Sequence, residues 1–123
     1  MNWPGTVKAG SASSDLVDFS DWLPTLAELA GAKLASGRPL DGQSFANSFR
    51  GIDGPLRAYA FSESRGKQGF VRDQRWKLYA NGKMFDLKQD PAEKKALPEK
   101  PESKEAQSAK ALLSQALDKL NFK

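Results

Sequence analysis

Residues 76–87 read WKLYANGKMFDL, and this stretch decides the fold of the chain. Apolar and polar side chains alternate on both sides of Asn81-Gly82, which is typical of strands with one buried face. Asn and Gly tolerate the positive φ angles that a two-residue type I′ hairpin needs. The stretch therefore predicts two antiparallel strands, 76–80 and 83–87. The side chains expected on one face of the sheet are Trp76, Leu78 and Ala80.

Two further stretches in which apolar and polar side chains alternate lie upstream, at 58–63 and 69–73. Downstream, apolar residues recur every three or four positions between 106 and 120, as on one face of a helix. We therefore expect an α+β fold, in which a small four-stranded antiparallel sheet is covered by a C-terminal helix.

The first half of the chain shows helical spacing from Leu16 onward, and Gly31 supplies a C-terminal stop. Pro24 is compatible with a helix only in its first turn. The pattern therefore predicts a loose turn at 20–23 and a regular helix at 24–30.

The remainder of this half is a connection rich in Gly and Pro, from 32 to 57. It contains one possible short helix at 44–50, with Phe45 and Phe49 facing inward. So long a connection is uncommon in a small domain, which suggests a tether that crosses the surface of a larger protein.

The 123 residues include neither Cys nor His, so disulfides are excluded. No apolar run approaches the roughly 18 residues of a membrane span, and no leader pattern begins the chain. The net charge is +4, and residues 58–123 carry fourteen basic and nine acidic side chains. One hypothesis is therefore a stand-alone basic module that binds nucleic acid or an acidic glycan. Solvated helix and loop faces explain the same lysines without a ligand.

Six short motifs follow one another along the chain. They are Trp3-Pro4-Gly5, Asp21-Trp22-Leu23-Pro24-Thr25-Leu26, Asp41-Gly42-Gln43-Ser44, Arg75-Trp76-Lys77-Leu78, Phe85-Asp86-Leu87 and Asp90-Pro91-Ala92-Glu93. In this order they resemble the carboxyl-terminal part of the formylglycine-dependent, arylsulfatase-like sulfatases. The last two motifs are the most specific match, although the family's following Asn-Leu is absent here.

The resemblance implies that residues 1–52 are the tail of an alkaline-phosphatase-like α/β catalytic domain and that 53–123 form a small C-terminal domain. Such sulfatases hydrolyse sulfate esters with calcium and with a formylglycine made in a Cys/Ser-x-Pro-Ser/Ala-x-Arg motif. This chain has no such motif. We therefore assign it no catalytic and no metal residue, and expect a sulfatase fragment that is inactive alone. The implied partners are the missing N-terminal domain and the parent's sulfated ester, not nucleic acid or a membrane, in a periplasmic or secreted enzyme.

The candidate site residues are Arg65, Lys67 and Gln68, in the loop expected between the first two strands. Loops of the small domain reach the rim of the active site in some members of the family. Basic side chains there suit a sulfated substrate, and a solvated turn is the alternative.

The acids of the last two motifs could in principle do acid–base work or hold a metal, but both roles need a shaped, convergent site. We instead expect Asp86, Asp90 and Glu93 to end a strand and begin a turn.

Overall fold

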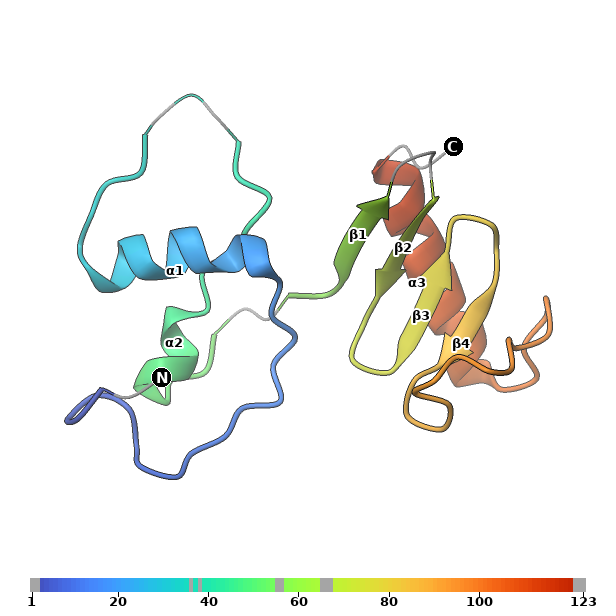
Figure 1. Cartoon of the computed structure of the whole chain (residues 1–123), viewed down its shortest axis with the longest axis horizontal. Helices are drawn as coiled ribbons and strands as arrows, with labels where there is room; N and C mark the ends of the chain where they lie inside the picture. The colour runs from blue at the N-terminus through green and yellow to red at the C-terminus, as the bar shows by residue number, and fades with distance from the viewer. Residues whose placement is uncertain (1–2, 36, 38, 55–56, 65–67, 121–123) are drawn as a thin grey trace. The chain divides into compact units, whose positions relative to one another are not determined.

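A computed structural model describes residues 3–35, 37, 39–54, 57–64 and 68–120. The chain divides into two compact units, Met1–Arg57 and Ala58–Lys123, which Figure 1 shows. Within the described residues, no helix has the length and apolar character needed to span a membrane.

The second unit contains a four-stranded antiparallel sheet in the order β1-β2-β3-β4, as predicted. Its strands are β1 (Ala60–Ser64), β2 (Gln68–Arg72), β3 (Trp76–Tyr79) and β4 (Met84–Asp86). Val71 pairs with Leu78, and Leu78 pairs in turn with Met84. These three buried residues form a row across the inner face of the sheet.

The hairpin between β3 and β4 differs from the predicted two-residue turn. Three residues, 80–82, separate the paired strand ends, and only Gly82 among them has a positive φ, of 85°. Such a loop is a type I turn followed by one left-handed residue. Ala80 consequently lies in the turn instead of the strand, where its N–H donates to the carbonyl of Gly69.

Helix α3 (Lys104–Lys119) packs against β2 and β3 and runs along one face of the sheet (Figure 1). Ser103 caps it by accepting a hydrogen bond from the N–H of Ala106. The core between helix and sheet consists of Val71, Trp76, Leu78, Met84, Ala106, Ala109, Leu113 and Ala116. Burying one large apolar side chain contributes about 1.5–3 kcal/mol to the stability of the folded state. This cluster therefore gives the second unit a stabilising core of its own.

The first unit contains a 3-10 turn η1 (Phe19–Asp21) and two helices, α1 (Trp22–Leu29) and α2 (Ala46–Arg50). Helix α1 begins two residues earlier than predicted. Pro24 is nevertheless accommodated, because the first four N–H groups of a helix have no intrahelical partner.

The centre of this unit is polar. Asp21 is 2% exposed, and its carboxylate accepts hydrogen bonds from the N–H of Asp18 at 2.8 Å and of Gln43 at 2.7 Å. Arg57 pairs with the same carboxylate, its Nε lying 2.8 Å from Oδ2. Thr25, also buried, links the carbonyl of Asp21 to the N–H of Phe45. One carboxylate therefore ties together η1, the loop before α2 and the end of the unit.

Apolar side chains of this unit lie largely on its surface. Phe19 is 90% exposed, and Leu23 and Leu26 of α1 are exposed as well. The rings of Trp22, Phe45 and Phe49 contact one another but stay only partly covered. The described residues of the first unit thus form no apolar core comparable to that of the second unit.

Candidate functional site

The acids of the closing motif take part in structural interactions, as predicted. Asp86 is buried and receives Arg75 in a forked contact, with Nη2 at 2.7 Å and Nε at 3.1 Å from Oδ2. This hydrogen bonding lowers the pKa of Asp86 and raises that of Arg75. Asp90 accepts the N–H of Lys95 at 2.8 Å and thereby closes a turn.

The third acid, Glu93, anchors the loop after β4 to the outer face of the sheet. It lies 2.7 Å from Lys77 Nζ and 2.5 Å from the hydroxyl of Tyr79. Burial opposes both charges, yet hydrogen bonds from Lys77 and Tyr79 hold the pKa of Glu93 low, and the bond to Glu93 raises the pKa of Lys77. All three motif acids are therefore engaged in structural contacts.

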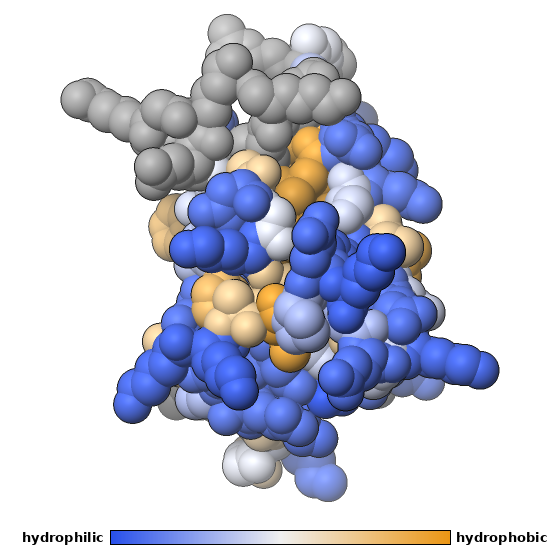
Figure 2. Space-filling model, turned by 90° about the vertical axis from the view of Figure 1, so that its right-hand side faces the viewer, coloured by the Kyte–Doolittle hydropathy of each residue, from blue (hydrophilic) through white to orange (hydrophobic). Residues whose placement is uncertain are grey.

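Four basic side chains line an open groove of about 680 Å³ in the second unit. We call this the cationic groove. Its basic residues are Arg72, Arg75, Lys77 and Lys88, and its acids are Glu93 and Glu105. Figure 2 shows the face of the molecule that carries the right-hand part of Figure 1, where hydrophilic side chains dominate and the hydrophobic areas are small.

Two of the groove cations lie close to aromatic rings of the sheet. Lys77 Nζ lies 4.0 Å from the ring centroid of Phe70 and 4.7 Å from that of Tyr79. Trp76 is buried in the core, with the Arg75 guanidinium 4.3 Å from its ring centroid. Trp76 is therefore closed to stacking on nucleic-acid bases, whereas Phe70 and Tyr79 are only partly buried.

The predicted rim residues are only partly described. Arg65 and Lys67 lie outside the described residues. The backbone of Gln68 opens β2, opposite Ser64, instead of lying in the loop. The sequence did not predict that the groove cations form one group. Arg72 and Lys77 are paired across neighbouring strands. The alternation of side chains within each strand could have indicated that these two share a face of the sheet.

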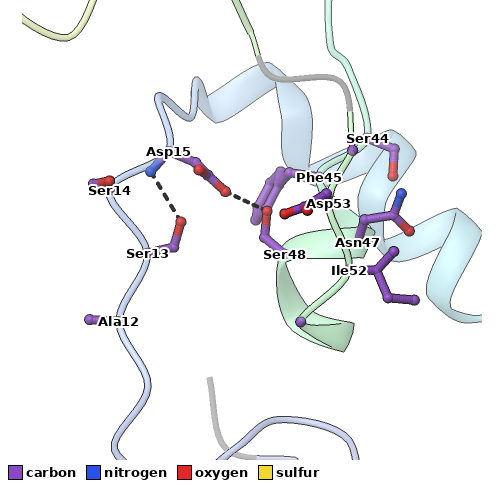
Figure 3. A pocket seen from close by; sticks show the side chains of 12 residues that line it. Ala12, Ser13, Ser14, Asp15, Ser44, Phe45, Asn47, Ser48, Ile52 and Asp53 are labelled. Carbon is purple, nitrogen blue, oxygen red and sulfur yellow. Dashed lines mark hydrogen bonds between the residues drawn. The ribbon is translucent and has the colours of Figure 1, made fainter.

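A second hollow, of about 620 Å³, lies in the first unit between the lead-in and α2. Figure 3 shows Asp15 and Ser48 pointing toward each other across it, with 2.5 Å between carboxylate and hydroxyl. Ser13 accepts the N–H of Asp15. These contacts hold the lead-in against α2.

Within the described part of the chain, no group of three or more His, Cys, Asp or Glu side chains could hold a metal ion. The acids that the motifs supply are instead engaged with Arg, Lys and backbone N–H groups. The residues present thus do not form a site for the calcium that the resemblance implies.

Known proteins share both the sequence and the fold. No family model matches the chain. It is 31% identical over 88 residues to the ulvan-active sulfatase of Formosa agariphila, a match that covers 64% of this chain and 17% of that protein. The structure of a 2-O GAG sulfatase matches 80% of the chain at 30% identity, with a TM-score of 0.58. The chain is homologous to the carboxyl-terminal part of sulfatases.

A third protein matches more of the chain than these two. BT4656, solved in complex with its substrate D-glucosamine-2-N,6-O-disulfate, matches 94% of this sulfatase homologue at 25% identity and a TM-score of 0.75. The homologue spans 27% of BT4656 and 24% of the 2-O GAG sulfatase. Both units therefore belong to the matched region, while most of each relative lies outside it.

Proposed function

We propose that this chain is the carboxyl-terminal part of a sulfuric ester hydrolase, which supports the catalytic domain and is not catalytic by itself. The observation that carries the proposal is the match to BT4656, which takes in 94% of this chain but 27% of that protein. The chain has no Cys/Ser-x-Pro-Ser/Ala-x-Arg motif, so the formylglycine and the calcium ligands belong to the part that precedes it.

The surface of the first unit supports a missing neighbour. Its exposed apolar residues include Phe19, Leu23 and Leu26. A contiguous apolar surface marks an interaction site in a soluble protein. We assign its cover to the α/β catalytic domain, of which residues 1–52 are the tail, with 53–123 as the small C-terminal domain.

The relatives' names suggest the substrate class. They mention ulvan, a GAG and a disulfated glucosamine. We therefore propose that the parent acts on a sulfated carbohydrate, and that Arg65, Lys67 and Gln68 rim its active site. Arginine and lysine would recognise the sulfate groups next to the reacting one through charge-assisted hydrogen bonds.

The coding DNA upstream of Met1 tests the central proposal. We expect an open frame that encodes a Cys/Ser-x-Pro-Ser/Ala-x-Arg motif. A stop codon directly before a ribosome-binding site at Met1 would refute it, because the chain would then be a separate protein.

The rim residues are tested in the parent enzyme. The double variant R65Q/K67Q should raise KM for a sulfated oligosaccharide and leave turnover of a small aryl sulfate unchanged. The matched control is K94Q/K95Q, which removes the same charge from exposed positions after the closing motif. An equal effect of both double variants would contradict a specific rim role.

A further inference from the structure

The cationic groove contains Arg72 at one end of β2, whereas Gln68, the described member of the proposed rim, opens the strand at its other end. Four residue steps of a strand span about 13 Å. Arg72 therefore lies about 13 Å along the strand from the backbone of Gln68.

The four cations of the groove are not equally engaged. Arg75 is paired with Asp86 and Glu105, and Lys77 is paired with Glu93. Arg72 donates from Nε to the carbonyl of its neighbour in sequence, at 3.0 Å. Among the described residues, no carboxylate lies within ion-pairing distance of Arg72 or of Lys88.

We propose that the cationic groove is an accessory subsite for a sulfate or carboxylate group of an anionic carbohydrate, bound by Arg72 and Lys88. Anion binding follows from these two side chains. The choice of a carbohydrate rests on the proposed function, and binding of nucleic acid is an outcome that the test distinguishes.

Glu105 is a built-in competitor for the bound anion. Its carboxylate is 2.8 Å from Arg75 Nη1, yet its side chain is 65% exposed. Exposed ion pairs are weak, so a sulfate can take its place beside Arg75. Glu93, by contrast, is held by two partners and stays in the wall of the groove.

The test uses the full chain and a size-defined heparin oligosaccharide, with binding followed by ¹H–¹⁵N spectra and by titration at several salt concentrations. We expect chemical-shift changes around the groove and an affinity that falls with salt. R72Q/K88Q should bind about threefold to tenfold more weakly. The matched control K83Q/K119Q removes two lysines outside the groove and should bind like the unmodified chain.

A second part of the test looks for a variant that binds the oligosaccharide more tightly. E105Q should bind the oligosaccharide more tightly, because it removes a negative charge from the groove and weakens the competing contact with Arg75 Nη1. E102Q removes an exposed acid that does not line the groove and should have a smaller effect.

Two results would overturn the proposal. Equal losses in R72Q/K88Q and K83Q/K119Q would mean that the whole basic unit attracts the polyanion without a site. Equal binding of single-stranded oligothymidylate would refute the assignment to a carbohydrate. Because none of these measurements involves ester hydrolysis, they can fail while the upstream DNA still encodes a sulfatase, and the reverse.

Discussion

Replacing Asp21 by Asn should unfold the first unit while leaving the second intact. In the wild type, each carboxylate oxygen of Asp21 accepts one backbone N–H, from Asp18 or Gln43, and one contact from Arg57. An amide has only one acceptor oxygen, so the substitution places an NH₂ group against donors and leaves Arg57 without its carboxylate.

The cost can be estimated from burial. The side chains of Asp21 and Arg57 are 2% and 6% exposed, so their pair is buried. Removing one partner of a buried ion pair costs about 3–5 kcal/mol. Whole domains are stable by only about 5–15 kcal/mol, and this unit has few buried apolar side chains to compensate. D21N should therefore remove most or all of its stability.

The assay is a ¹H–¹⁵N spectrum of the whole chain, in which the signals of residues 58–123 serve as an internal reference. D21N should collapse the dispersed signals of residues 3–54 and leave the reference signals in place. The control is D53N, which changes an exposed acid of the same unit and should preserve both sets. If D21N kept the first set dispersed, Asp21 would not organise the unit, and our account of this motif would be wrong.

Lowering the pH should reproduce part of the destabilisation that we expect of D21N. Burial alone would raise the pKa of Asp21, but the hydrogen bonds from Arg57 and from the N–H of Gln43 outweigh it and hold the pKa below the ordinary 3.8. A carboxylate with a lowered pKa stabilises the fold above its unfolded pKa, and the contribution is lost as pH falls through the folded value. The first unit should therefore lose stability below about pH 4.

Three further substitutions test the packing. Leu113 is 3% exposed and Leu112 is 67% exposed, so L113A should cost the second unit about 3 kcal/mol and L112A under 1 kcal/mol, measured by urea unfolding. Equal costs would mean that α3 does not cover the sheet through Leu113. G42A should destabilise the first unit, because the new Cβ would lie 2.1 Å from a backbone oxygen of η1; unchanged signals of that unit would contradict this close approach. E93Q should cost about 1 kcal/mol and weaken the loss of stability in acid, since the low pKa of Glu93 depends on Lys77; an unchanged pH profile would exclude that pair as its source.

The sheet and its helix were predictable because their signals are local. Alternation marked Trp76 and Leu78 as buried, and helical spacing marked Leu113 and Ala116. The turn type was not predictable from Asn-Gly alone, since the same dipeptide serves a three-residue loop in which only Gly82 needs a positive φ.

The partners of the motif residues were less accessible to sequence analysis. Asp21 meets Arg57 across 36 positions, and Arg75 meets Asp86 across 11. Neither pairing follows from periodicity, because it depends on how loops close in three dimensions. The same limit hid the groove, whose cations come from β2, from β3, from the turn between them and from the segment after β4.

The motifs that reveal the family are explained by folding rather than by chemistry. Asp21 organises the first unit, Gly42 permits the close approach of two backbones, and Asp86 fixes Arg75. Each is a position where another residue would leave a donor unpaired or force a clash. Such positions carry a strong sequence signal without any contact to a substrate. Sequence similarity to the carboxyl-terminal part of sulfatases therefore identifies the fold. The reaction must be assigned from the region that would contain the formylglycine.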